Sequence, residues 1–249
     1  MPVRFSTLLP RLLLLAALTF PVFGCGVVSP QTRRAPAPTP TPAAAQPSPS
    51  PAQGEPINRA TSEPYTGDLS IFEGAERAEK LQVERVLDVL GVKEGASVAD
   101  IGAGSGWFTV RAARRVGGAG QVYAVEINPE FVKHIERRAA EEKLPQVRAV
   151  LGKEDDPVLP ERSVDAVLIL KTYHEVAQPV RLLTRLRSAL RPGARVGVID
   201  RNGKGDDHGI ARDTVVREAE RAGFTLVEEH DFVKGDNMDY FLVFQVRKS

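Results

Sequence analysis

A short glycine-rich segment has residue types suited to binding a nucleotide-like cofactor. Asp100 is followed by Gly102, Ala103, Gly104 and Gly106. Glycine lets the backbone turn sharply, and its missing Cβ lets a ligand come close. The amides at the start of a following helix would then face that ligand. The segment therefore predicts a cofactor loop between a strand and a helix.

A second feature of this kind is Glu126, which ends the next apolar run, twenty residues after Gly106. A carboxylate placed there can accept hydrogen bonds from both ribose hydroxyls, as in dinucleotide sites. The glycine loop alone is a weak signal, but loop, helix, strand and terminal acid together are a stronger one. The glycine spacing, G-x-G-x-G, differs from the dinucleotide pattern and argues against a nicotinamide-dependent oxidoreductase.

Polar side chains also follow a later apolar run, at Lys171, Thr172, Tyr173, His174 and Glu175. A base is needed wherever a substrate must lose a proton during the reaction. His174 is the candidate base, and Tyr173 could orient the substrate. His174 could instead cap or bridge the next loop. His208, further along the chain, could also face the pocket.

Metal ligation is not expected from the sequence. Cys25 is the only cysteine, so no disulfide can form within the chain. The histidines are scattered, and no Cys/His group has the spacing of a zinc site. Net charge is only +1, with acids and bases intermixed, so nucleic acid is not an expected partner.

The elements that must position these residues alternate between strand and helix periodicity. Strands are predicted over residues 97–101, 121–126, 147–151, 164–170, 194–200, 225–231 and 240–246. Helices are predicted over residues 71–90, 107–116, 129–142, 179–190 and 211–222. This alternation predicts an α/β fold: a Rossmann-like three-layer sandwich with a seven-stranded, mostly parallel sheet. The short loop before the last strand makes that strand antiparallel.

The N-terminal quarter has a different composition. Residues 1–28 combine two arginines, an apolar run and small residues, as in a secretory signal segment. The stretch Val22-Phe23-Gly24-Cys25 resembles the lipobox of bacterial lipoproteins, although Phe23 departs from its small-residue pattern. Ordinary cleavage and an uncleaved anchor remain alternatives. Residues 29–61 are rich in proline and predict an extended linker, and residues 62–249 predict the folded domain.

The motifs in residues 70–249 resemble those of class I S-adenosylmethionine-dependent methyltransferases. The resemblance rests on Val98-Ala99-Asp100-Ile101-Gly102-Ala103-Gly104-Ser105-Gly106 and on Val122-Tyr123-Ala124-Val125-Glu126. It continues at Gly152-Lys153-Glu154-Asp155-Asp156, at Ser163-Val164-Asp165-Ala166-Val167-Leu168 and at Leu190-Arg191-Pro192-Gly193-Ala194-Arg195. It implies S-adenosyl-L-methionine as the cofactor and methyl transfer as the reaction.

The resemblance also implies roles for individual residues. The loop glycines would wrap the methionine part of the cofactor, with Asp100 near its amino group. Glu126 would hold the ribose, and Ile127 would pack on the adenine. Asp155, or its neighbour, would lie near the adenine amine, and Lys171 would line the methionine side or the substrate mouth.

Two functional hypotheses follow. The first is an active methyltransferase with a small-molecule or lipid acceptor, exported and held at a membrane by a lipid on Cys25, facing the periplasm or the cell exterior. The second is an exported binding module that kept the fold and lost the reaction. The export signal keeps the second open, because S-adenosylmethionine is made in the cytoplasm. The intact loop and Glu126 favour the first, and the oligomeric state is left open.

Overall fold

The computed structural model describes residues 57–61, 65–204 and 208–248. The predicted signal segment, Cys25 and nearly all of the predicted linker lie outside these residues. Within the described part of the chain, none of the helices has the length and apolar character needed to cross a membrane.

A seven-stranded sheet forms the centre of the fold, in the order β3-β2-β1-β4-β5-β7-β6. Its strands are β1 (Ser97–Ile101), β2 (Gln121–Glu126), β3 (Val147–Leu151), β4 (Val164–Leu170), β5 (Leu190–Asp200), β6 (Phe224–His230) and β7 (Tyr240–Val246). Strands β1 to β5 pair in parallel, whereas β7 runs antiparallel to both β5 and β6. The predicted seven-stranded, mostly parallel sheet with an antiparallel last strand is confirmed.

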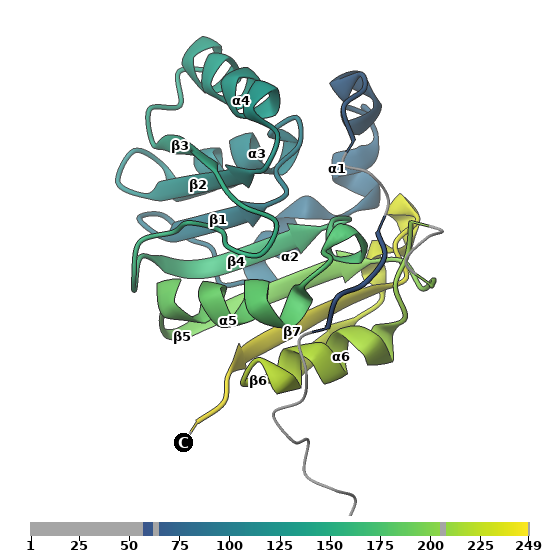
Figure 1. The fold of residues 1–249 in the computed structure, drawn as a ribbon. Helices are drawn as coiled ribbons and strands as arrows, with labels where there is room; N and C mark the ends of the chain where they lie inside the picture. The colour runs from purple at the N-terminus through teal and green to yellow at the C-terminus, as the bar shows by residue number, and fades with distance from the viewer. Residues whose placement is uncertain (1–56, 62–64, 205–207, 249) are drawn as a thin grey trace, which may run out of the picture. The chain divides into compact units, whose positions relative to one another are not determined.

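Helices cover both faces of this sheet, which gives the predicted three layers (Figure 1). They are α1 (Arg77–Lys80), α2 (Val83–Val89), α3 (Trp107–Val116), α4 (Pro129–Glu141), α5 (Pro179–Ala189) and α6 (Arg212–Arg221), with short 3-10 helices η1 (Leu69–Phe72), η2 (Tyr173–Glu175) and η3 (Phe232–Asp236). One apolar cluster joins α2 and α3 to the sheet, and a second joins α5 and α6 to its other face. Strands β1 and β4 are therefore buried from both sides, as expected for central parallel strands.

The single helix predicted over residues 71–90 is wrong. The structure divides this stretch into η1, α1 and α2. Gln82 lies between the two helices with a left-handed backbone (φ 53°), which interrupts the helical hydrogen-bond ladder. The apolar residues at helical spacing still pack into the core, because Leu81, Val86 and Leu87 are fully buried. The spacing of the apolar residues thus indicated which side chains are buried, but not where the helix is interrupted.

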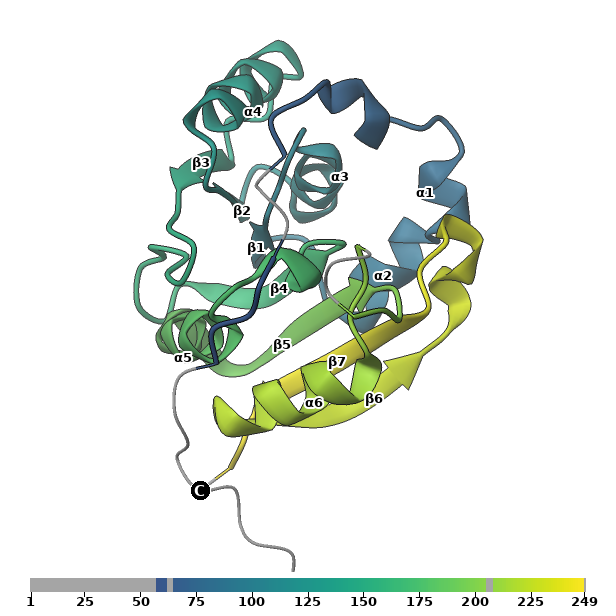
Figure 2. The same cartoon turned by 45° about the vertical axis from the view of Figure 1, so that its right-hand side comes forward.

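The folded part also begins earlier than the boundary predicted at residue 62. The backbone N–H of Arg59 donates to the carbonyl of Ala177 (2.8 Å), directly before α5. Its guanidinium pairs with Glu218 on α6 (2.9 Å), and both side chains are largely buried. Figure 2 shows this segment beside α5. Residues around Arg59 therefore belong to the domain.

One edge of the sheet collects the groups singled out by sequence. The carboxyl ends of β1, β2, β4 and β5 meet there, and the strand order reverses between β1 and β4. Open α/β sheets bind ligands at such a switch point, outside the carboxyl ends of the strands.

Candidate functional site

The glycine loop after β1 is held by its neighbours on both sides. Gly102, Gly104 and Gly106 all have left-handed backbones, with φ of 72°, 55° and 76°. A Cβ on Gly102 would lie only 2.3 Å from the side chain of Thr172, so a larger residue would separate this loop from the one after β4. The amides of Gly102 and Ala103 both donate to the carbonyl of Val125. These two amides therefore bond to β2 and hold the loop against it.

Glu126 connects the loop to the start of the next crossover. Its Oε2 accepts from the amide of Gly104 (2.9 Å), and its Oε1 accepts from those of Ile127 (2.7 Å) and Asn128 (3.1 Å). A carboxylate offers about four acceptor positions, so three amides leave capacity for a ribose hydroxyl. The backbone thus fixes this carboxylate in the place where the sequence predicts ribose binding.

Asp100 lies beneath the loop, and only 2% of its surface is exposed. The Thr109 hydroxyl in the first turn of α3 donates to it (2.6 Å). Burial raises the pKa of Asp100 to about 6, the Thr109 bond partly opposes this, and the charge of Glu126 adds to the rise. The structure thus gives Asp100 a role in anchoring α3, while its predicted contact with the cofactor amino group stays a prediction.

The predicted adenine-binding residues differ in their surroundings. Ile127 directly follows Glu126 and is 39% exposed, so an apolar side chain is available beside the ribose acid. Asp155 forms an ion pair with Arg181 of α5 (2.7 Å). A carboxylate already paired in this way is a weaker candidate for the adenine amine, and its role stays a prediction.

The segment of residues 67–73, just before α1, packs against the outside of the glycine loop. Glu73 accepts from the Ser105 hydroxyl (2.6 Å) and from the Arg138 guanidinium (2.5 Å), and Arg138 also donates to the Ser105 carbonyl. Phe72 lies about 3.8 Å from where a Cβ on Gly104 would be. Sequence reasoning did not identify Glu73 or Arg138, because neither belongs to a local motif.

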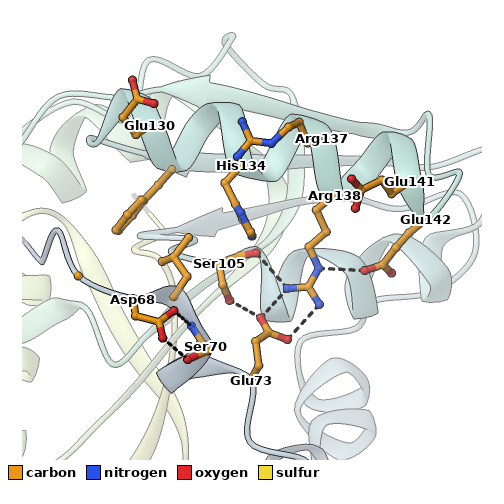
Figure 3. A pocket seen from close by; sticks show the side chains of 13 residues that line it. Asp68, Ser70, Glu73, Ser105, Glu130, His134, Arg137, Arg138, Glu141 and Glu142 are labelled. Atoms are coloured by element: carbon orange, nitrogen blue, oxygen red, sulfur yellow. Dashed lines mark hydrogen bonds and ion pairs between the residues drawn. The ribbon is translucent and has the colours of Figure 1, made fainter.

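The same segment and α4 enclose a cleft of about 740 Å³, seen in Figure 3. Its walls carry charges of both signs, and Ser105 is its only contribution from the glycine loop. Neither Glu126 nor Ile127 lines it. The cleft is therefore separate from the edge where the strands end.

At the neighbouring end of β4, His174 is bound by a buried acid. Its Nδ1 lies 2.9 Å from both carboxylate oxygens of Asp200, at the end of β5, and its backbone amide donates to the same side chain. Its Nε2 lies 3.2 Å from Glu175 Oε1, so a carboxylate stands beside each ring nitrogen. A buried acid that fixes an imidazole in this way is the arrangement used in hydrolase triads to orient a base.

Tyr173 does not occupy the place predicted for it. Its side chain is fully buried, and its hydroxyl donates to Glu218 of α6 (3.0 Å). Burial and the nearby Glu218 raise the pKa of Tyr173 well above its usual range. A core hydroxyl held by Glu218 cannot orient an acceptor at the sheet edge, so the structure does not support a catalytic role for Tyr173.

Lys171 leaves β4 with a left-handed backbone (φ 51°). Desolvation lowers the pKa of its ammonium group, and the charges of Arg77 and Arg201 lower it further. Asp200 and Asp236 act in the opposite direction. Two of these charged groups, Asp200 and Asp236, belong to β5 and η3. Lys171 therefore fits its predicted place at the substrate mouth better than a place beside the methionine part of the cofactor.

Comparisons with known proteins agree with this geometry. Residues 98–193 match the family model described as a methyltransferase domain. The match runs from β1 into β5, which is less than half of the chain, and it includes both the glycine loop and His174. The comparisons support S-adenosyl-L-methionine as the cofactor, as the sequence predicts.

Two relatives with similar sequences are methyltransferases by name. An uncharacterized methyltransferase of Mycobacterium tuberculosis is 36% identical over 124 residues, which is 50% of this chain and 47% of the relative. Nocamycin O-methyltransferase of Saccharothrix syringae is 32% identical over 114 residues, 46% of this chain and 41% of the relative. The chain thus spans about half the length of these curated relatives.

The fold has solved counterparts as well. A SAM-dependent methyltransferase from Aquifex aeolicus superposes with a TM-score of 0.64 at 24% identity, covering 71% of this chain and 95% of the other. At this identity the likeness establishes the fold of the domain.

Proposed function

We propose that this protein is an S-adenosylmethionine-dependent methyltransferase that acts on a small-molecule or lipid acceptor. One observation carries the proposal. The Glu126 carboxylate is fixed by three backbone amides at the carboxyl end of β2, next to an exposed Ile127. An acid and an apolar residue in this arrangement suit a ribose and an adenine.

The chain's own residues divide the work between two parts of the sheet edge. The glycine loop and Glu126 would bind and orient the cofactor, which supplies a sulfonium-bound methyl group that leaves as the carbon–sulfur bond breaks. His174, fixed by Asp200, has its Nε2 beside Glu175 on the acceptor side of the sheet edge. Nε2 can take the proton that an acceptor hydroxyl or amine loses as its oxygen or nitrogen is methylated.

Binding and turnover together test this function. The chain is incubated with cofactor labelled in its methyl group and with extracts of membrane lipids or soluble metabolites. We expect the label to move to a component of one extract, and we expect Glu126→Ala to lower this transfer strongly at cofactor concentrations near the wild-type Kd. Tight binding without transfer to either extract would favour the silent binding module instead.

We also propose that the chain is exported and anchored by a lipid on Cys25. The supporting features are the apolar run before Cys25, its position as the only cysteine, and the proline-rich stretch that follows it. Growth with a labelled fatty acid should label the wild type and leave Cys25→Ser unlabelled. Equal labelling of both would contradict the anchor.

A further inference from the structure

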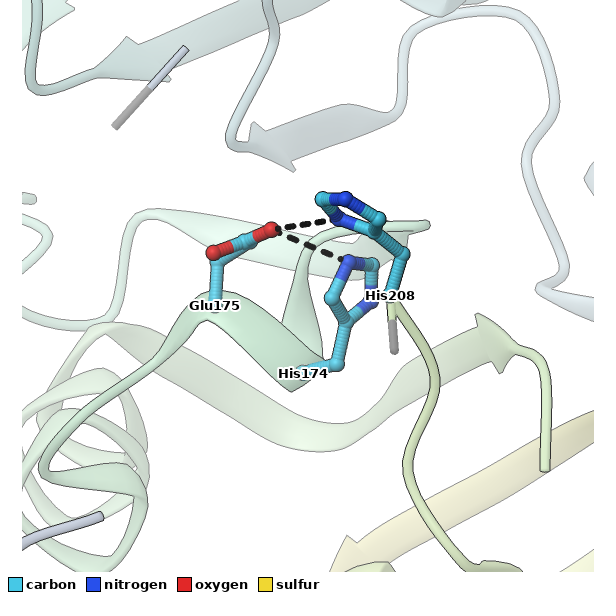
Figure 4. Close-up of side chains that lie close together, drawn as sticks. All are labelled: His174, Glu175 and His208. Atoms are coloured by element: carbon cyan, nitrogen blue, oxygen red, sulfur yellow. Dashed lines mark hydrogen bonds and ion pairs between the residues drawn. The ribbon is translucent and has the colours of Figure 1, made fainter. Parts of the chain in front are cut away.

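Three metal-binding side chains converge at the acceptor side of the sheet edge (Figure 4). His174 and Glu175 lie in η2 after β4, whereas His208 comes from the segment after β5. Glu175 Oε1 lies 3.2 Å from His174 Nε2 and 3.3 Å from His208 Nδ1. One donor atom from each residue lies within 4.8 Å of the other two.

Both ring nitrogens of His174 face carboxylates. Nδ1 lies 2.9 Å from Asp200, and Nε2 lies 3.2 Å from Glu175 Oε1. The second oxygen of Glu175, Oε2, is buried and finds no hydrogen-bond partner among the described residues. A buried, unsatisfied carboxylate oxygen is costly, and it needs an explanation.

The backbone around His208 holds it in reach of the cluster. Ile210 donates its amide to the carbonyl of Arg201 (2.7 Å), and the Arg201 guanidinium donates to the carbonyl of His208 (3.1 Å). A Cβ on Gly209 would lie 2.9 Å from the carbonyl oxygens of Arg201 and Asn202. Only glycine allows this close return of the chain, which brings His208 beside Glu175.

We propose that His174, Glu175 and His208 bind a divalent transition-metal ion, with Zn²⁺ as the leading candidate. Two imidazoles and one carboxylate form the ligand set of many catalytic zinc sites, in which a further position stays open. With metal–ligand bonds of about 2.1 Å, tetrahedral ligands lie roughly 3.4 Å apart, close to the two separations seen here. Asp200 supplies the carboxylate that commonly orients a metal-bound histidine.

The ion would have a defined place in the reaction, and this part of the inference rests on the proposed function. An acceptor oxygen could fill its open position, and a bound cation favours loss of the proton from that oxygen. His174 Nε2 would then be a ligand and not the base. Occupancy of the site therefore decides which of the two roles His174 has.

Metal titration of the full chain tests the site. Protein carrying Cys25→Ser, which removes the thiol as a competing ligand, is stripped with a chelator and titrated with Zn²⁺ in a calorimeter. Co²⁺ is titrated in parallel, and its visible absorption reports the coordination. We expect one ion per chain, and we expect His208→Ala and Glu175→Gln each to weaken binding by about tenfold or more. His208 is 62% exposed, so its replacement leaves the fold intact.

His134→Ala is the matched control, because it removes a histidine on α4 that lies outside the cluster and should leave Zn²⁺ affinity unchanged. Binding with equal affinity in the wild type, His208→Ala and Glu175→Gln would overturn the proposal, as would no stoichiometric binding. In that case a direct contact between His174 and Glu175 explains the geometry. Cofactor affinity, measured on the same samples, should not change in His208→Ala, so failure of the metal site is distinguishable from failure of the methyltransferase function.

Discussion

The cofactor side and the acceptor side of the sheet edge are built in different ways. On the cofactor side, Asp100, the glycine loop and Glu126 belong to one strand–helix–strand unit, and backbone amides make most of the bonds. On the acceptor side, His174 and Asp200 come from the ends of two different strands, and side chains make the contacts. A backbone amide is present whatever the side chain, so a substitution can remove only the acceptor of such a bond, whereas it can remove either partner of a side-chain contact. The cofactor side is therefore suited to binding a cofactor that does not vary, and the acceptor side to reacting with one particular acceptor.

Replacing His174 should show that the acceptor side can lose its function while the cofactor side keeps its own. With an acceptor identified by label transfer, His174→Ala should lower kcat by about 10² to 10⁴, the usual contribution of a positioned proton-transfer group. Cofactor affinity should stay within about twofold, because no hydrogen bond or ion pair found for His174 among the described residues involves the glycine loop. Kinetics and calorimetry on the same protein check both statements. A loss of affinity equal to the loss of rate would mean that the two sides are not independent.

The buried acid of the cofactor side predicts a pH effect on stability. The folded-state pKa of Asp100 is raised to about 6, so between about pH 4 and pH 6 the folded chain holds a proton that the unfolded chain releases. Stability from this group is therefore greatest at low pH and falls as pH rises through the window, by about 3 kcal/mol in total.

Asp100→Asn keeps the bond to Thr109 and cannot ionise, so it should lack this slope. Urea unfolding at several pH values measures the difference between the two proteins. Parallel curves for the wild type and Asp100→Asn would show that Asp100 does not titrate in this range.

Loss of the ribose acid should weaken cofactor binding alone. Glu126→Ala removes a charged acceptor of hydrogen bonds, worth about 1.5 to 3 kcal/mol, so we expect about 10- to 100-fold weaker binding of S-adenosylmethionine. Glu130→Ala, which removes an exposed acid four residues later on α4, is the control and should bind normally. If both variants bind equally well, Glu126 does not hold the ribose.

The smallest effect is expected at Tyr173, between the acceptor side and the core. Tyr173→Phe removes one hydrogen bond to Glu218, which keeps its ion pair with Arg59, so stability should fall by about 1 kcal/mol. The rate of methyl transfer should change little. Thermal unfolding and kinetics test this, and a large loss of rate in a stably folded variant would restore the catalytic role predicted from sequence.

The difference between the cofactor side and the acceptor side also explains how much of the structure could be predicted from the sequence. All seven strands and most of the helices follow from local periodicity and capping, and the predicted bounds of β1, α3 and β2 agree with the structure. The cofactor loop and Glu126 were recognisable because they belong to one continuous unit. The bonds that Asp100 and Glu126 make could not be seen in advance, but their places could.

The acceptor side was less accessible to such reasoning. Tyr173 and His174 are neighbours, yet in η2 one side chain enters the core and the other meets Asp200. That divergence depends on the left-handed turn at Lys171, which no pattern indicated. His208 meets Glu175 across 33 residues of chain, so the histidines looked scattered. Asp200 had one available signal, since like Glu126 it is an acid at the end of a buried strand.

The central claim is that the carboxyl edge of β1 and β2 is an S-adenosylmethionine site, and a calorimetric titration of the full chain tests it most directly. The account predicts one site per chain with micromolar affinity for the cofactor or its demethylated product, and weaker binding in Glu126→Ala. Absence of binding to either compound by correctly folded protein would contradict it.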